Sequence, residues 1–205
     1  MFRFFQVNRD IFLRTLCLVA VTLFFTSAGA SQGEIILAVN TLLMQLFTLF
    51  SYVMDGFAYA GEALSGRYIG ARNREAFTDT VRHLFGWGAV IAVLFTLVYA
   101  LGGNAFLGLL TDDKEVIAVA DTYFYWALAV PAVGIAAFIW DGIFIGATAT
   151  RGMLLSMAAA AVSFFILYYG LRPVLANHAL WLAFLTYLLI RGVVQTGLSR
   201  EVIRR

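Results

Sequence analysis

The chain has 205 residues, of which 62% are hydrophobic and only 13% are charged, with a net charge of +2. A typical soluble domain is about 45–50% apolar and about 25% charged, so this composition predicts an integral membrane protein. It excludes a disordered tail and a nucleic-acid binder. With one cysteine, Cys17, and two histidines, the chain offers neither a disulfide nor a metal cluster, and we expect no metal and no cofactor.

Six stretches are long and apolar enough to cross a bilayer, which takes about 20 residues because the hydrocarbon core is about 30 Å thick. In chain order they cover residues 11–30, 35–58, 84–102, 116–148, 153–171 and 180–198. Strand-like alternation is absent, which excludes a β-barrel. We therefore expect an all-α integral membrane protein, with residues 1–205 forming a single bundle of six transmembrane helices.

The first stretch has a second interpretation as a secretory signal, because arginines precede an apolar run that ends in Ala28-Gly29-Ala30. The run from Leu16 towards Gly29 lies at the upper edge of the length of a signal core, which is about 7–15 residues. Residues 31–34 also suit a tight turn between two helices. We therefore favour a membrane helix over a cleaved leader.

The positive charges fall mainly on one side of the predicted bundle, as expected for loops that face the cytoplasm. Eleven arginines belong to the termini and to the second and fourth loops: Arg3, Arg9, Arg14, Arg67, Arg72, Arg74, Arg82, Arg151, Arg200, Arg204 and Arg205. The other side has two basic residues, Lys114 and Arg172. We therefore expect a multi-pass protein of the inner or plasma membrane with both termini in the cytoplasm. Arg14 and Arg191 could snorkel to the cytoplasmic interface.

Asp141 is the most informative acidic residue at membrane depth. It lies ten residues before Arg151, which places it about 15 Å above the cytoplasmic boundary at about 1.5 Å per residue. A central aspartate costs about 2.5–3.5 kcal/mol in insertion measurements, so such residues usually face a polar interior and often serve transport. Two interpretations stay open, a proton-coupling carboxyl and a structural acid that pairs with Arg191.

Asp55 and Glu62 are two further candidates for cation coupling. They are seven residues apart, so they share one face of a helix. We expect Asp55 near the cytoplasmic end of the second span and Glu62 at or beyond the boundary. There, pairing of Glu62 with Arg67 is the simpler interpretation.

Glycine pairs at a spacing of four, Gly142 with Gly146 and Gly66 with Gly70, predict close packing of helices. Motifs of enzymes are absent: the sequence has no phosphate-cradling loop, no HExxH and no Gly-x-Ser-x-Gly elbow. We therefore expect a packed bundle that is not an enzyme.

Three segments resemble the MATE family, the multidrug and toxic compound extrusion transporters. Residues 55–71 (DGFAYAGEALSGRYIGA) resemble a helix-and-loop signature of the family. Residues 140–148 (WDGIFIGAT) resemble the tenth helix of its DinF-like branch, and residues 8–15 (NRDIFLRT) the start of the seventh. The matches follow the family's order across nearly the whole chain.

The resemblance implies a bundle like helices seven to twelve, the second of the two lobes of such a transporter. The first lobe is missing, so we expect a longer reading frame, a split gene or a truncated gene. Asp141 matches the acidic position of the tenth helix. No acid lies between Ile11 and Ala30, where some members bind a cation with a glutamate, so we expect protons rather than sodium as the coupling ion.

The function that follows is the C-terminal half of a multidrug efflux antiporter, which exports organic or cationic compounds by alternating access in the lipid bilayer. Its expected partners are a small organic substrate and either the missing N-terminal lobe or a second copy of the chain. Two alternatives stay open: a lipid-linked oligosaccharide flippase of the same superfamily, and a fragment that does not transport.

Overall fold

The computed structural model describes the backbone of residues 2–203 and the side chains of residues 5–103, 105–200 and 202. Arg204 and Arg205, which enter the charge count above, lie outside the described residues, as does the side chain of Arg3. Six α-helices account for nearly all of the described backbone: α1 (Phe2–Ala30), α2 (Glu34–Gly70), α3 (Arg74–Leu110), α4 (Lys114–Gly146), α5 (Thr150–Leu175) and α6 (Asn177–Ile203). The predicted all-α fold is confirmed.

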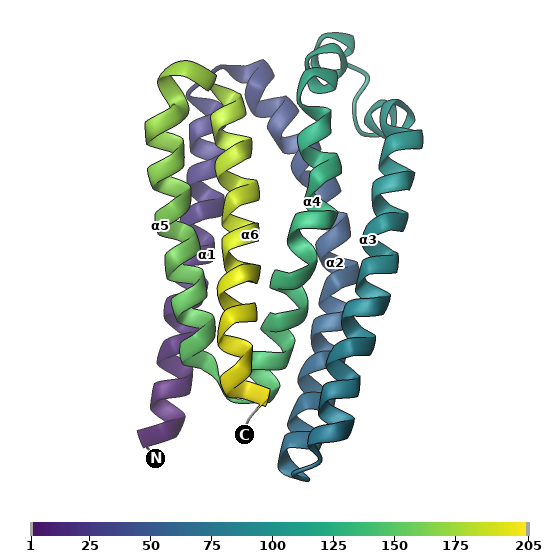
Figure 1. The fold of residues 1–205 in the computed structure, drawn as a ribbon. Coiled ribbons are helices and arrows are strands. Elements are labelled where there is room, and N and C mark those ends of the chain that lie inside the picture. The colour runs from purple at the N-terminus through teal and green to yellow at the C-terminus, as the bar shows by residue number, and fades with distance from the viewer. Residues whose placement is uncertain (1, 204–205) are drawn as a thin grey trace.

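The helices run alternately up and down, so both ends of the chain lie at the same end of the bundle (Figure 1). We call this the terminal end; it also carries the turns at residues 71–73 and 147–149. The opposite end, with the turns at residues 31–33 and 111–113 and with Ala176, is the distal end. The two ends differ in their polar contacts, as described below.

Every helix except α4 is longer than the span predicted from hydropathy, because hydropathy marks the part of a helix that lies in hydrocarbon and not its polar turns. Helices α2 and α3 have 37 residues each, about 55 Å at ~1.5 Å per residue, against a hydrocarbon core of about 30 Å. They project furthest at the terminal end (Figure 1). The fourth span was placed too far along the chain, since α4 ends at Gly146 and Thr148 lies in a turn.

The two turns at the terminal end share one backbone geometry. Arg72 and Thr148 occupy equivalent left-handed positions, with φ of 54° and 53°, and the hydrogen bonds around them follow the same pattern. The turns differ in the residue that follows. The side chain of Asn73 accepts a hydrogen bond from the amide of Ala76 and caps α3, whereas Ala149 leaves α5 without a side-chain cap.

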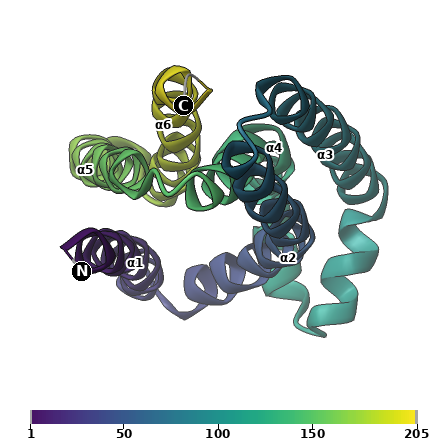
Figure 2. The same ribbon diagram turned by 90° about the horizontal axis from the view of Figure 1, so that it is seen from below.

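Helix α4 is the central element, packed against α2, α3 and α6, while α5 lies between α1 and α6 (Figure 2). The contact with α2 is close because it is made at glycines. A Cβ atom on Gly142 would overlap the carbonyl oxygen of Ala58, and one on Gly146 would overlap that of Glu62. These two contacts set α2 and α4 side by side in parallel over the terminal half of the bundle.

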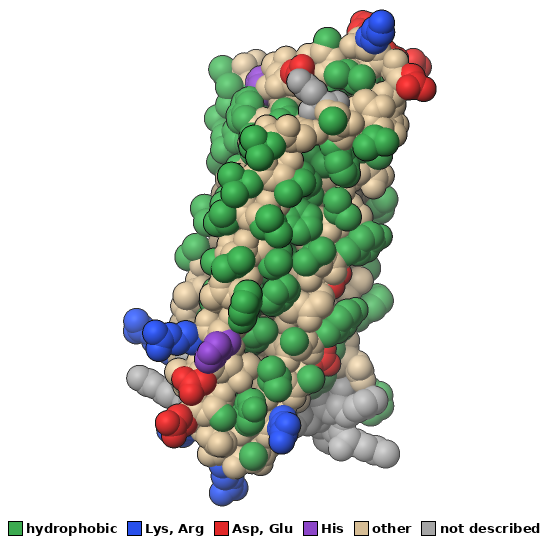
Figure 3. Space-filling model, turned by 90° about the vertical axis from the view of Figure 1, so that its right-hand side faces the viewer, with side chains coloured by type: hydrophobic (Ala, Val, Ile, Leu, Met, Phe, Trp, Pro, Cys, Tyr) green, Lys and Arg blue, Asp and Glu red, His purple; other side chains and the backbone are tan. Residues whose placement is uncertain are grey.

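The outer surface suits a lipid environment. All six helices are long and apolar enough to cross a membrane. On the face that includes α3, hydrophobic side chains cover the middle of the molecule, and charged side chains gather mainly towards its two ends (Figure 3). Large exposed hydrophobic residues such as Leu94, Leu97 and Leu101 lie on this helix. The molecule is therefore a multi-pass membrane protein.

Candidate functional site

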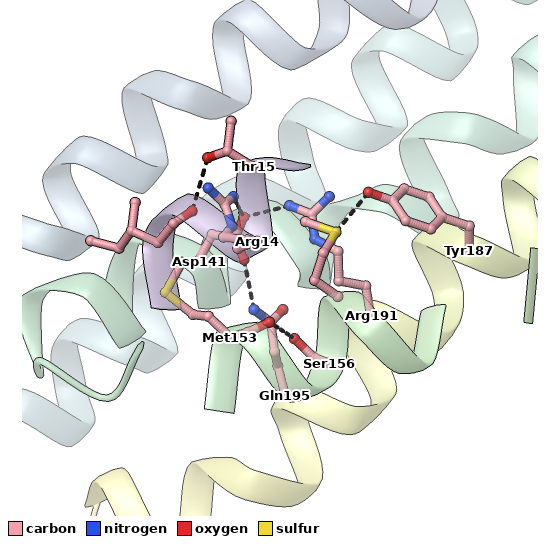
Figure 4. Close-up of polar contacts among 10 residues, drawn as sticks. Arg14, Thr15, Asp141, Met153, Ser156, Tyr187, Arg191 and Gln195 are labelled. Carbon is pink, nitrogen blue, oxygen red and sulfur yellow. Dashed lines mark hydrogen bonds and ion pairs between the residues drawn. The ribbon is translucent and has the colours of Figure 1, made fainter. Parts of the chain in front are cut away.

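A buried ionic cluster joins three helices in the terminal half of the bundle. The Oδ2 atom of Asp141 on α4 accepts hydrogen bonds from Arg14 on α1 and from Nη2 of Arg191 on α6, the latter at 2.5 Å. Its Oδ1 atom accepts one from Nε2 of Gln195, at 2.6 Å (Figure 4). Asp141 is 5% exposed and Arg191 4%, so this is a charged centre shielded from water. We call these four residues the ionic cluster.

The depth predicted for Asp141 was wrong. The prediction counted ten residues of helix down to Arg151, but α4 ends at Gly146 and a turn intervenes before α5. Asp141 therefore lies five residues from the end of its helix, about 8 Å at ~1.5 Å per residue. This position is nearer to the terminal end than to the middle of the bundle.

Arg14 and Arg191 do not snorkel to the interface, which the sequence alone had left possible. The two guanidinium groups turn inward and meet at the same carboxylate oxygen of Asp141 (Figure 4). The physical reason is that a buried charge is stabilised only by a partner of opposite sign. The pairing of Asp141 with Arg191, one of the two interpretations that the sequence left open, is present.

Asp55 lies beside the ionic cluster but outside it. Its neighbour on the same turn of α2, Ala58, contacts Gly142 of α4, so Asp55 lies at about the depth of Asp141. Asp55 is partly buried, and it interacts electrostatically with Asp141 and both arginines of the cluster. Among the described residues, no hydrogen bond or ion pair reaches its carboxylate.

Glu62 is separate from this centre. It lies two turns further along α2, where its backbone carbonyl faces Gly146 at the end of α4. Its side chain is partly buried, and the ion pairs found among the described side chains do not include the expected one with Arg67. The structure thus brings Asp55 close to Asp141, whereas Glu62 lies nearer to the terminal end.

The charges and hydrogen bonds of the ionic cluster are not fully matched. Two guanidinium groups contact one carboxylate, and the carboxylate of Asp55 nearby would balance the charge. Within the cluster, three buried atoms have no hydrogen-bond partner among the described residues: Nε of Arg14, Nε of Arg191 and Oε1 of Gln195. Unpaired polar atoms in a low-dielectric site are energetically unfavourable. The cluster therefore has spare donors and acceptors that a rearrangement, a proton or a polar ligand could use.

A second polar contact lies below the cluster at the terminal end. Asp10 of α1 is 2% exposed and accepts a hydrogen bond from the hydroxyl of Thr150, at 3.2 Å. The two residues line a cavity of about 410 Å³ between α1, α5 and α6, together with Phe144 of α4. Asp10 thus binds the first turn of α5, the helix that lacks a side-chain cap of its own.

Gln195 and Asp10 were missed by the sequence analysis. A signal for Gln195 existed, because it follows Arg191 by four residues and two polar side chains at this spacing share a face of an otherwise apolar helix. Asp10 stands within the segment 8–15 quoted above but was given no role of its own, and it adjoins Arg9 in the sequence. The structure does pair it with Arg9, at 3.2 Å, yet it buries the carboxylate against α5.

Comparisons with known proteins identify the fold and the family. The chain is 42% identical over 199 residues to DNA damage-inducible protein F of Escherichia coli (strain K12), covering 97% of this chain and 43% of that protein. It is 26% identical over 133 residues to Protein DETOXIFICATION 45, chloroplastic, of Arabidopsis thaliana, covering 65% of this chain and 24% of that protein. The chain spans less than half the length of these curated relatives.

A solved structure, "Crystal structure of MATE in the bent conformation", shares the fold, with a TM-score of 0.80 over 95% of this chain and 43% of that one, at 17% identity. The family model MatE matches residues 11–174, which is most of the chain. These matches confirm the resemblance predicted from the sequence. The chain belongs to the MatE family.

Proposed function

We propose that this chain forms one lobe of a multidrug efflux antiporter, which exports organic or cationic compounds in exchange for protons by alternating access. The observation that carries the proposal is the buried ionic cluster, because charged residues at membrane depth are rare and usually serve transport. Asp141 is held by groups from α1 and α6 at once. A change of its charge therefore acts on three helices together.

Protonation of Asp141 is the coupling step in this proposal. A neutral carboxyl no longer compensates Arg14 and Arg191, and a proton shifts the conformational equilibrium only if the two conformations bind it with different affinity. Asp55 is the nearby acid that would then balance one of the arginines, which gives the cluster a second arrangement. This role assigns Asp141 as the proton carrier and Asp55 as its alternate partner, while Glu62 takes no part in the exchange.

The lobe requires a second wall to enclose a substrate. Two lobes that rock about a central cleft give alternating access in transporters built from repeats. The relatives are more than twice as long as this chain, and a second lobe, either an N-terminal one or another copy of this chain, supplies the missing wall. The proposed partners are therefore that lobe, the lipid bilayer and a small organic substrate.

We also propose that both termini lie in the cytoplasm of a cell with this protein in its inner or plasma membrane, because the arginines favour that side. Cysteines placed at Arg74 and at Asp113, in a Cys17→Ala background, test the orientation with an impermeant thiol reagent on intact cells. Position 113 should be labelled and position 74 protected. The reverse pattern would overturn the proposal.

The experiment that tests the function uses the two-lobed protein in liposomes with an imposed pH gradient and a fluorescent organic cation. Asp141→Asn should abolish gradient-driven dye movement, and Asp79→Asn, which changes an exposed acid of α3, should leave it unchanged. The double variant Asp141→Asn with Arg14→Gln leaves the net charge of the cluster unchanged. It therefore distinguishes a loss of proton coupling from a loss of folding caused by an unbalanced arginine. Normal dye movement with normal pH dependence in either Asp141 variant would show that the residue is structural.

A further inference from the structure

An aromatic cluster encloses a histidine at the distal end of the bundle, far from the ionic cluster. His178 lies in the first turn of α6, and three aromatic residues of α4 surround it. The ring centroid of Tyr123 is 4.6 Å from that of His178, and the ring of Tyr125 lies nearly parallel to the imidazole, at 6.1 Å. The third ring, of Trp126, lies at 6.3 Å. We call these four residues the histidine cage.

The hydrogen bonds of the cage favour one tautomer of the imidazole. Nε1 of Trp126 lies 3.1 Å from Nδ1 of His178, and an indole N–H can only donate. Nδ1 must therefore accept, so the imidazole is neutral and its proton is on Nε2. The hydroxyl of Tyr125 also lies 3.0 Å from the same nitrogen. Both contacts join α4 to α6.

A proton added to His178 binds at Nδ1, because that nitrogen carries the lone pair. Nδ1 then becomes a donor facing another donor, so the bond from Trp126 is lost, while Tyr125 can reverse its role and accept. The ring of Tyr123 lies close enough to stabilise the imidazolium through cation–π contact. Protonation thus breaks the hydrogen bond between Trp126 of α4 and His178 of α6, and the imidazolium remains stabilised by the aromatic residues around it.

Other charged groups do not compete for this imidazole. From α4, the titratable groups facing His178 are the phenols of Tyr123 and Tyr125. Asp121 of α4 and Arg172 of α5 are exposed, and among the described side chains no ion pair links His178 to either of them or to a residue of α2. His178 is itself partly exposed, so protons can reach it.

We propose that His178 is a proton-binding site of the distal end, and that its protonation releases Trp126 and loosens the contact between α4 and α6 there. The same two helices carry Asp141, Arg191 and Gln195 towards the terminal end, so the pair has a proton-sensitive group near each end. The proposal is independent of the export activity proposed above, since it concerns a local change in the chain itself.

The test measures quenching of tryptophan emission by acrylamide in the full chain, in detergent or nanodiscs, as the pH is lowered from about 8 to about 5, the range in which histidine changes its charge. Quenching should rise in one step as Trp126 becomes more accessible. His178→Gln should abolish the step, because the glutamine cannot titrate. His83→Gln is the matched control and should keep the step, since His83 binds the carbonyl of Asp79 at the other end.

Trp126→Phe provides a second, independent variant that keeps the histidine. It removes both the donor and the emission of this tryptophan, so the step should disappear while the chain still carries Trp87, Trp140 and Trp181. A step that persists in His178→Gln or in Trp126→Phe would overturn the proposal, as would its absence in the unmodified chain. Loss of the step in His83→Gln would move the proton site to the terminal end.

Discussion

Two of the buried polar clusters that join helices in the described part of the chain are built in opposite ways. At the distal end, Asn40 of α2 and Asn177 of α6 exchange two amide hydrogen bonds, at 2.8 and 2.9 Å, and the indole N–H of Trp181 donates to Asn40 at 2.9 Å. We call these three residues the amide cluster. It is neutral, and all its buried side-chain polar atoms have partners. The ionic cluster is charged and leaves three polar atoms unpaired.

The amide cluster is a fixed contact, whereas the ionic cluster is a contact that can change. A neutral network with every donor and acceptor used has one favourable arrangement, because any movement leaves buried groups unpaired. In the ionic cluster, Arg14 has an unused Nε atom and a second acid, Asp55, in electrostatic reach. Other arrangements, in which Arg14 turns towards Asp55, are therefore open to it. We infer that the distal end holds α2 and α6 together while the terminal end rearranges.

The largest effect is expected for removal of the central acid. Asp141→Ala leaves the buried Arg191 and the partly buried Arg14 without their partner, and breaking a buried ion pair in this way typically destabilises a protein by about 3–5 kcal/mol. Unfolding of the chain in detergent, followed by circular dichroism during a denaturant titration, measures the loss.

The matched control removes all three charges of the ionic cluster together. Asp141→Leu combined with Arg14→Met and Arg191→Met replaces the ions by apolar groups, which is often neutral or stabilising. The triple variant should therefore be more stable than Asp141→Ala while showing no transport in the two-lobed protein. Equal destabilisation of the two variants would mean that packing, and not charge, explains the effect.

A smaller effect is expected at the amide cluster. Asn40→Ala leaves the amide of Asn177 and the indole N–H of Trp181 without partners, and an unsatisfied buried group costs about 1–3 kcal/mol. The same denaturant titration measures the change. Thr41→Ala is the control on the exposed side of α2, where the hydroxyl binds only the carbonyl of Leu37. If the two alanine variants unfold alike, the amide cluster does not hold the distal end.

The fold could be predicted from the sequence because a membrane helix is a local property, visible as an apolar run of sufficient length. The site could be predicted only in part. Asp141 was recognised since a buried acid is rare in such a run, but its depth was misjudged because the end of α4 depends on a left-handed backbone at Thr148. The sequence contains no pattern that predicts this turn.

The partners of the site were harder to predict than its centre. Arg14 lies 127 residues before Asp141 in the chain. The residues next to an arginine in the sequence do not predict whether its side chain turns to the interface or to a buried acid. The amide cluster joins residues 137 apart, and single asparagines in apolar helices were not considered. Contacts of this kind depend on which helix faces are adjacent, which only the tertiary structure shows.

The smallest effect, and the one opposite in sign, is expected beside the amide cluster. Ala176 connects α5 to Asn177 with φ of 45° and ψ of −118°, a conformation that side chains with a Cβ rarely adopt and glycine adopts readily. Ala176→Gly should relieve strain and stabilise the chain by about 1 kcal/mol, despite the greater freedom that glycine has when unfolded. Ala159→Gly, the same change at an exposed position inside α5, should destabilise by about 1 kcal/mol. Opposite shifts of the unfolding midpoint would show that the fixed contact holds a strained turn in place, whereas destabilisation by both glycines would show that Ala176 is unstrained.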